Sequence, residues 1–220
     1  MPLKAVLFDM DGVIVDTEPI HKKAYFRMFE NFGAAVSEEQ YASFAGASTR
    51  KVCNSVKNRF DLNVQVEEME SVKRTYFKKL FYNDADFDMV SGVKKLIEHY
   101  FENKITMVLA TSASHTTIKM VFEKFGLYPF FKAIISGTDL KESKPNPEIF
   151  IKAAELAGEA PGNCMVIEDS TNGITAASRA GIFCAAYKGG NTKFQDYSLA
   201  NIVVNDFSEL ELSKIESYFK

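Results

Sequence analysis

Residues 5–19 read AVLFDMDGVIVDTEP, and this stretch decides the fold class of the chain. The apolar run Ala5–Phe8 has the length and composition of a strand that is buried on both faces of a parallel sheet. Asp9 and Asp11 follow it directly, and Gly12 after them suits a turn. Ligands of open parallel sheets bind beyond the carboxyl ends of the strands, so the two acids mark a candidate functional site.

The rest of the chain alternates predicted strands with predicted helices. Further short apolar runs indicate strands at Ile105–Ala110, Ala133–Ile135, Met165–Ile167, Ile182–Ala186 and Ile202–Val204. Between the later runs, apolar residues recur at helical spacing and each pattern ends at a glycine, namely Gly126, Gly158 and Gly181. This alternation is typical of a parallel sheet covered by helices on both faces. We therefore predict an α/β fold, a doubly wound parallel sheet with a Rossmann-like core.

The first crossover of this sheet carries an insertion. Asp9 and Ile105 are 96 positions apart (105 − 9), about three times the roughly 30 residues of a strand–helix–strand unit. Apolar residues recur at helical spacing in three inserted segments, residues 20–32, 52–60 and 66–80, the last interrupted by Lys73. Ser37–Gln40 has the form of a capping box. We predict a catalytic core of residues 1–16 and 88–220 and an all-helical cap domain of residues 17–87.

Polar side chains follow the predicted strands where parallel strands end at a common edge. Besides Asp9 and Asp11, these are Thr111 and Ser112 after the second run, Lys144 in the loop after the third, and Glu168 and Asp169 after the fourth. Two carboxylates ~4 Å apart repel by about 4 kcal/mol at an effective dielectric constant of 20, so such a cluster needs a cation. Hard oxygen ligands favour Mg²⁺, which usually shares its coordination with water and a substrate phosphate.

The same residues suggest a phosphoryl-transfer reaction. A carboxylate can attack phosphorus and form an aspartyl phosphate, which divides a difficult hydrolysis into two easier steps. Asp11 is placed to protonate the leaving oxygen and then to accept a proton from the attacking water. Lys144 supplies a positive charge, and Thr111 and Ser112, which we expect to open a helix, offer donors to phosphate oxygens.

Four motifs of the chain together resemble those of the haloacid dehalogenase-like hydrolases: AVLFDMDGVIVDTEP, Thr111–Ser112, Ser143–Pro147 and Val166–Ser170. The helical insertion resembles the cap of the β-phosphoglucomutase-like branch of that family. The resemblance implies Asp9 as nucleophile, Asp11 as general acid and base, and Thr111 and Lys144 as phosphate-binding residues. It also implies that four acidic residues surround magnesium: Asp9, Asp11 through its carbonyl, Glu168 and Asp169.

The resemblance leaves the exact reaction open. We expect a magnesium-dependent phosphatase for a small phosphorylated metabolite, plausibly a sugar phosphate, whose cap selects the substrate. A hexose-phosphate mutase is the close alternative, although such mutases carry Lys just before the cap glycine and Arg three residues after it, where this chain has Ala45 and Thr49. A pyrophosphatase and a non-catalytic phosphoacceptor module are less favoured. Candidate substrate-binding residues of the cap are His21, Gly46 and Arg50.

The composition narrows the classes of partner. Hydrophobic residues make up 46% and charged residues 25%, as in ordinary globular proteins, and the net charge of −3 gives no basic surplus for nucleic acid or membrane binding. Three widely spaced cysteines predict neither a disulfide framework nor a zinc site. The start, Met1–Lys4, has no secretory signal, so we expect a cytoplasmic protein. We expect a monomer or weak dimer whose partner is a small phosphorylated substrate.

Overall fold

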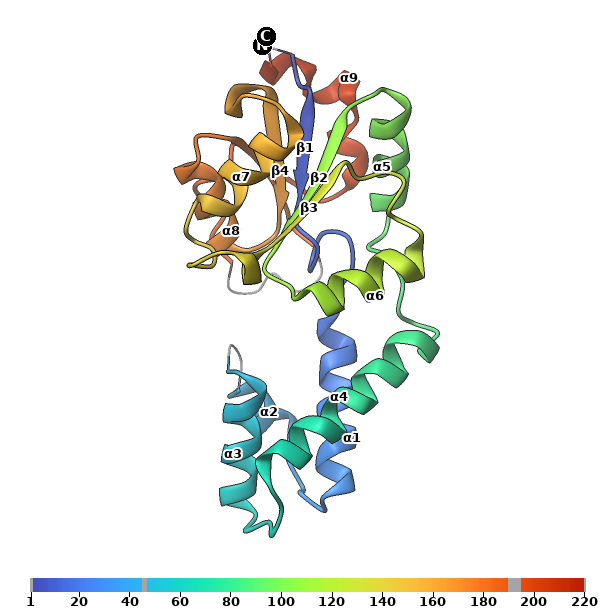
Figure 1. Cartoon of the computed structure of the whole chain (residues 1–220), viewed down its shortest axis with the longest axis vertical. Helices are drawn as coiled ribbons and strands as arrows, with labels where there is room; N and C mark the ends of the chain where they lie inside the picture. Colours follow the sequence, from blue (N-terminus) through green and yellow to red (C-terminus); the bar gives the residue numbers. More distant parts are fainter. Residues whose placement is uncertain (1, 45–46, 190–194, 220) are drawn as a thin grey trace. The chain divides into compact units, whose positions relative to one another are not determined.

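The computed structural model describes residues 2–44, 47–189 and 195–219. The chain forms two compact units (Figure 1): Met1–Asp16 together with Asp88–Lys220, and Thr17–Phe87 between them in sequence. We call the first the sheet unit and the second the helical unit, and each is described by itself.

In its described residues, the sheet unit contains six parallel strands in the order β3-β2-β1-β4-β5-β6. Their bounds lie within one residue of the predicted apolar runs: β1 Ala5–Phe8, β2 Thr106–Thr111, β3 Ala133–Ser136, β4 Cys164–Glu168, β5 Phe183–Tyr187 and β6 Ile202–Val204. From β1, strands β2 and β3 extend the sheet toward one edge, and β4, β5 and β6 extend it toward the opposite edge. The order therefore reverses next to β1, where such folds bind ligands.

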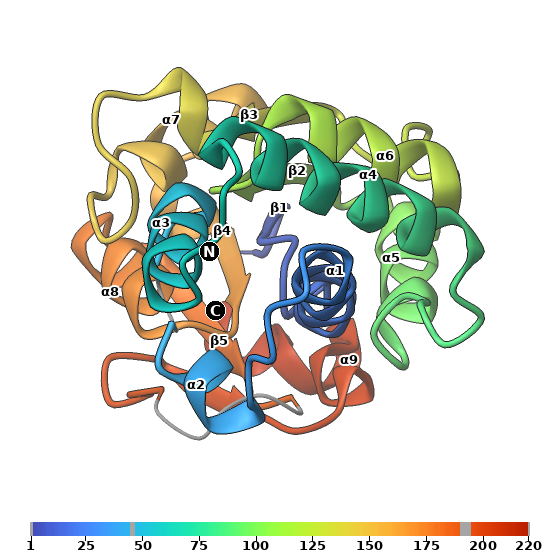
Figure 2. The ribbon, with the colours of Figure 1, turned by 90° about the horizontal axis from the view of Figure 1, so that it is seen from below.

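Helices cover both faces of this sheet, as Figure 2 shows. The helices of the sheet unit are α5 Val93–Glu102, α6 His115–Phe125, α7 Glu148–Ala157, α8 Thr171–Arg179 and α9 Leu212–Ile215. On one face, α7 and α8 pack their buried side chains against Leu7, Val108 and Val166. On the opposite face, the ring of Phe8 contacts Tyr100 of α5 and Phe131. The predicted doubly wound parallel sheet is confirmed.

Two helices differ from the sequence-based expectation. Helix α5 was not predicted, although Val93, Leu96, Ile97 and Tyr100 are all buried at helical spacing. Helix α6 begins at His115 instead of at Thr111–Ser112, because the Ser114 side chain caps it by accepting a hydrogen bond from Thr117 N. Thr111 thus ends β2, and Ser112 lies in the turn before the helix.

The helical unit contains four helices in its described residues: α1 Glu18–Asn31, α2 Glu38–Ala42, α3 Thr49–Arg59 and α4 Val66–Asn83. The predicted capping box at Ser37 and Gln40 is present and begins α2. Met28, Phe29, Val56 and Met69 form the centre of an apolar core between the helices. The predicted helical segments are therefore confirmed.

Two further observations concern the cysteines and the lengths of the helices. Cys53, Cys164 and Cys184 are free thiols, and all three are buried. Among the residues that the structure describes, no helix is both long enough and apolar enough to cross a membrane.

Candidate active site

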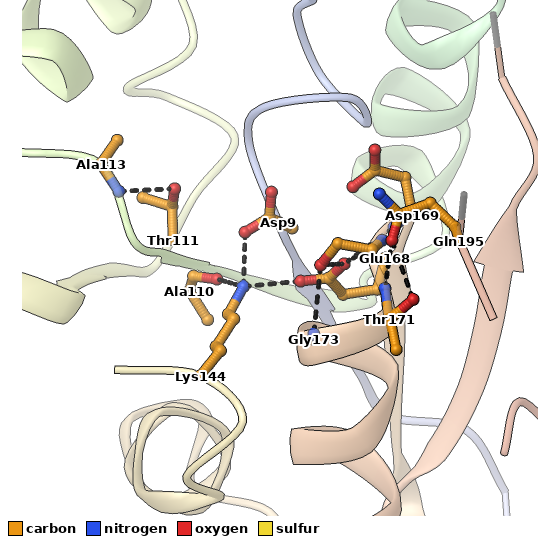
Figure 3. A network of polar contacts seen from close by, with 11 residues as sticks. Asp9, Ala110, Thr111, Ala113, Lys144, Glu168, Asp169, Thr171, Gly173 and Gln195 are labelled. Carbon is orange, nitrogen blue, oxygen red and sulfur yellow. Dashed lines mark hydrogen bonds and ion pairs between the residues drawn. The ribbon is translucent and has the colours of Figure 1, made fainter. Parts of the chain in front are cut away.

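The ammonium group of Lys144 joins three strand ends (Figure 3). Its Nζ atom donates hydrogen bonds to Asp9 Oδ1 at 2.5 Å, to Glu168 Oε1 at 2.8 Å and to the carbonyl oxygen of Ala110 at 3.0 Å. Asp9 follows β1, Glu168 ends β4 and Ala110 lies in β2. The residues singled out after separate strands are therefore brought together around one buried cation.

Burial controls the charges of this cluster. Asp9, Lys144 and Glu168 are only 6%, 9% and 1% exposed. Burial raises the pKa of Asp9 well above its usual value, and the charges of Glu168 and Asp11 raise it further, while Lys144 opposes the shift. Burial lowers the pKa of Lys144, but Asp9 and Glu168 outweigh that effect and raise it above its usual value. Lys144 is therefore a fixed cation, and Asp9 depends on positive charge to stay ionised.

The turn after β4 is held by Glu168. Its Oε2 atom accepts hydrogen bonds from Asp169 N at 2.8 Å, Ser170 N at 2.8 Å and Ser170 Oγ at 2.9 Å. A β-carbon on Gly173 would lie 1.7 Å from Glu168 Oε1, so only glycine fits there. Both carboxylate oxygens of Glu168 thus have donors, and its side chain is fixed in place.

Asp169 lies against the turn that contains Asp11. A β-carbon on Gly12 would lie 2.0 Å from Asp169 Oδ2, so a larger residue would clash there. Gly12 also has a φ of +83°, a backbone conformation that favours glycine. Burial raises the pKa of Asp169 to about 7, and the charges of Glu168 and Asp11 add to the shift. The structure therefore brings Asp11 and Asp169 into one electrostatic environment.

Thr111 is the last residue of β2, and Ser112 begins the turn that follows it. Thr111 is buried, and its Oγ1 atom accepts a hydrogen bond from Ala113 N at 3.1 Å. The carbonyl of Ala113 in turn accepts a hydrogen bond from Ser136 Oγ at 2.6 Å, which fixes the turn to the end of β3. A threonine hydroxyl that accepts one hydrogen bond still has a proton to donate. Ser112 is exposed beside it.

The donor chemistry of this edge fits a hard divalent cation. Asp9, Asp11, Glu168 and Asp169 supply carboxylates beside the cation Lys144, and burial together with the neighbouring negative charges raises the pKa values of Asp9 and Asp169. Across residues 2–44, 47–189 and 195–219, no three carboxylate, imidazole or thiol groups are close enough to hold a metal by themselves. Mg²⁺ is ordinarily bound by one or two carboxylates together with water and phosphate oxygens.

The helical unit has a polar pocket of its own. It has a volume of about 370 Å³ and its lining includes Glu18, His21, Tyr41, Thr49 and Lys73. Lys73 is only 5% exposed, and its Nζ atom lies 2.7 Å from His21 Nδ1. Because an ammonium group has no acceptor, Lys73 donates this hydrogen bond and His21 is neutral. Burial lowers the pKa of His21 to about 4, and the charge of Lys73 contributes.

Sequence reasoning singled out His21 but missed Lys73. The available signal was a lysine at an apolar position of a helical pattern, which places a charge on a buried face. Of the other two candidates, Arg50 is exposed and forms an ion pair with Glu67. Gly46 lies outside the described residues.

Comparisons with known proteins agree with the geometry of the sheet unit. A model of the haloacid dehalogenase-like hydrolase family matches residues 6–187. A phosphorylated carbohydrates phosphatase of Thermotoga maritima is 30% identical over 82% of this chain and 82% of its own length. The β-phosphoglucomutase of Bacillus subtilis is 27% identical over 96% of this chain and 92% of its own length.

A crystal structure of a Thermotoga maritima protein is similar in fold, with a TM-score of 0.85 and 26% identity over 96% of this chain and 98% of that chain. The family match covers β1 to β5 and thus every strand end that carries a candidate residue. The chain therefore belongs to the haloacid dehalogenase-like hydrolases.

Proposed function

We propose that this hydrolase is a magnesium-dependent phosphatase that cleaves a small phosphorylated carbohydrate through an aspartyl phosphate on Asp9. The observation that carries the proposal is the buried ammonium of Lys144 between Asp9 Oδ1 and Glu168 Oε1. This arrangement orients one carboxylate at the centre of a parallel sheet and supplies the charge that a phosphoryl group needs. In this proposal the sheet unit is the catalytic core and the helical unit is the cap.

The proposed reaction has two steps. In the first, a carboxylate oxygen of Asp9 bonds to phosphorus while the bond from phosphorus to the leaving oxygen breaks, and Asp11 donates a proton to that oxygen. In the second, Asp11 accepts a proton from water as the water oxygen bonds to phosphorus, and the bond to Asp9 breaks. The products are the dephosphorylated carbohydrate and inorganic phosphate.

Three side chains would hold the phosphoryl group during both steps. The Lys144 ammonium neutralises its charge, and the Thr111 and Ser112 hydroxyls donate hydrogen bonds to its oxygens. Because the turn at Thr111 is fixed to β3 through Ala113 and Ser136, the Thr111 donor is oriented before the substrate binds.

Asp9, the carbonyl of Asp11 and Asp169 would bind Mg²⁺, and Glu168 would contribute through its charge and by holding Asp169 N. When bound, the ion would neutralise carboxylates and phosphate oxygens in the way that the raised pKa values of Asp9 and Asp169 require.

We assign the non-phosphate part of the substrate to the pocket of the helical unit. Lys73 and the hydroxyl of Thr49 can donate hydrogen bonds, Glu18 can accept them, and the aromatic residue Tyr41 adds an apolar wall. Such a mixture suits a polyhydroxylated ligand, in keeping with the name of the Thermotoga maritima relative. His21 would orient Lys73, whereas Arg50 would have to leave Glu67 to reach a substrate. Gly46 stays a candidate from the sequence.

A hexose-phosphate mutase is the second candidate, and the similarity to a β-phosphoglucomutase along almost the whole chain favours it. Both reactions use the same aspartyl phosphate and differ in its acceptor. We expect that incubation with glucose 1-phosphates and hexose 6-phosphates releases inorganic phosphate. Isomerised sugar phosphate without free phosphate would establish the mutase instead.

The phosphatase proposal is tested with a panel of sugar phosphates, other phosphate esters and pyrophosphate, with and without Mg²⁺. Release of phosphate from sugar phosphates only with Mg²⁺, together with mass-spectrometric detection of a phosphoryl group on Asp9, supports it. A phosphoryl group that stays on Asp9 for hours while Asp11 is intact would instead indicate a phosphoacceptor module.

A further inference from the structure

A segment beyond β5 reaches back to the start of α8. The side chain of Gln195 accepts two hydrogen bonds at Oε1, from Thr171 N at 2.7 Å and from Thr171 Oγ1 at 2.9 Å. The next residue adds a third bond to the same threonine, from Asp196 N to Thr171 Oγ1 at 2.7 Å. Thr171 is the first residue of α8, so this helix start is fixed from a distant part of the chain.

The bond from Thr171 N to Gln195 satisfies a backbone N–H group at the start of α8. The first N–H groups of a helix have no acceptor within the helix. The N-cap Ser170 satisfies Gly173 N, and Gln195 satisfies Thr171 N. Figure 3 shows the side chain of Gln195 at the same end of α8 as Asp169.

The turn from residue 168 to residue 171 is therefore held at both ends. Glu168 holds its beginning through Asp169 N and Ser170 N, and Gln195 holds its end through Thr171. Asp169 lies between these two anchors. The two anchors hold the backbone on either side of Asp169 and so the direction of its Cα–Cβ bond, because each residue has only two soft backbone dihedral angles.

The second anchor, Gln195, is a neutral amide and not a carboxylate. The N-terminus of a helix favours a negative charge, so a carboxylate would be the better acceptor for α8 alone. Glu168, Asp169 and Asp11 already concentrate negative charge there. A neutral amide oxygen fixes the helix start without adding to that charge.

We propose that Gln195 is a positioning residue for the metal site, which acts through Thr171 to hold the Asp169 carboxylate in the direction that binds Mg²⁺. This inference rests on the proposed function only in that Asp169 binds the ion. Partners that orient metal ligands typically change metal affinity by about 10- to 100-fold when they are removed.

The test measures Mg²⁺ binding by isothermal titration calorimetry without substrate, and the Mg²⁺-dependent shift of the unfolding temperature. Gln195→Leu keeps the size of the side chain but removes the acceptor, and we expect it to raise the Kd for Mg²⁺ about tenfold. Thr171→Val removes only the hydroxyl, and the bond from the backbone N of residue 171 to Gln195 Oε1 remains, so we expect a smaller loss of affinity, which Thr171→Ser should restore. Leu199→Ala, an exposed position in the same connection, is the control.

Steady-state kinetics separate this role from substrate binding. At saturating Mg²⁺, Gln195→Leu should leave the KM for p-nitrophenyl phosphate nearly unchanged, because Thr111 and Lys144 lie on other elements. The double variant Gln195→Leu with Thr171→Val should weaken Mg²⁺ binding by less than the two single effects combined, since both substitutions remove the bond between Thr171 Oγ1 and Gln195 Oε1.

Three results would overturn the inference. One is a Gln195→Leu variant that unfolds at a lower temperature but binds Mg²⁺ within about twofold of the wild type, since such a role is only structural. Another is Thr171→Ser binding Mg²⁺ as weakly as Thr171→Val. The third is additive weakening in the double variant. If the wild type itself binds no Mg²⁺, the proposed metal site fails instead, and this outcome is distinguishable from the others.

Discussion

Gly173 and Glu168 lie so close together that a β-carbon on Gly173 would be 1.7 Å from Glu168 Oε1. The same oxygen accepts a hydrogen bond from Lys144 Nζ at 2.8 Å. The absence of a side chain in α8 therefore determines where the acid at the end of β4, and through it the buried lysine, can lie.

Gly173→Ala tests this relationship. Alanine is favoured over glycine inside a helix by about 1 kcal/mol, so propensity alone predicts stabilisation. We expect the opposite, because the methyl group displaces Glu168: lower stability in urea unfolding and a loss of phosphatase activity of about 100-fold or more. Asn172→Ala, on the exposed side of the same helix turn, should have little effect. A Gly173→Ala variant with normal activity and higher stability would contradict the packing described here.

Removal of the buried Lys144 ammonium should lower the free energy of unfolding as well as the activity. Lys144→Met leaves the carboxylates of Asp9 and Glu168 without their shared partner, and breaking a buried ion pair in this way typically destabilises a protein by about 3–5 kcal/mol. We expect that loss in chemical denaturation together with loss of turnover. Lys152→Met, which breaks an exposed pair with Glu148 on α7, is the matched control and should cost no more than about 1 kcal/mol.

Substitutions of Asp9 and Asp11 should have different effects on the rate of turnover. Asp9→Asn should abolish turnover while the circular dichroism spectrum and the Mg²⁺-dependent thermal stability stay recognisable, since Lys144 keeps its bond to Glu168. Asp11→Asn should slow both chemical steps, because proton transfer typically contributes about 100- to 10,000-fold. Normal turnover in the first variant, or a rate within about threefold of the wild type in the second, would remove the assigned role.

The pocket of the helical unit predicts a pH dependence of stability. Burial lowers the pKa of Lys73 from 10.5 to about 8, although Glu18 opposes the shift. Between these two pH values the unfolded chain holds a proton that the folded chain has released, so the free energy of unfolding should rise with pH from about 8 to 10.5. Below pH 8 the full cost of burying the ammonium is present, up to about 3 kcal/mol at about 1.4 kcal/mol per pKa unit.

Lys73→Met should therefore stabilise the helical unit at pH 7 and remove this rise, as measured by hydrogen exchange of amides in residues 17–87. Lys78→Met, at an exposed position of the same helix, should do neither. Unchanged exchange rates in Lys73→Met would show that its contacts with the Tyr25 and Phe77 rings already offset the cost of burial.

The same pocket predicts a loss of stability in acid. The pKa of His21 is lowered from 6.5 to about 4, so the unfolded chain gains a proton first and stability should fall as the pH decreases from about 6.5 to 4. His21→Asn should make this decrease smaller. A decrease of the same size in both proteins would assign it to other groups.

The order of the strands and the residues proposed for catalysis follow from sequence patterns. Runs such as Ala5–Phe8 predicted the strands because a strand buried on both faces must be apolar throughout. Parallel strands end at one edge, so the sequence is enough to group the acids after β1 and β4 with the lysine after β3. Helix α5 was missed even though its buried face follows the helical period.

The tertiary structure alone decided the contacts of these side chains. Lys144 bonds to residues 135 and 24 positions away, and Gln195 bonds to one 24 positions away, and no local pattern encodes which donor meets which acceptor. The burial of Lys73 likewise depends on tertiary contacts that no local pattern encodes. A lysine in a helical pattern is ordinarily solvated, but Lys73 is buried beside the Tyr25 ring of α1 and the Phe77 ring of its own helix, and this burial lowers its pKa. Sequence periodicity reports which face of an element is apolar, whereas the pairing of polar groups depends on three-dimensional distances that folding creates.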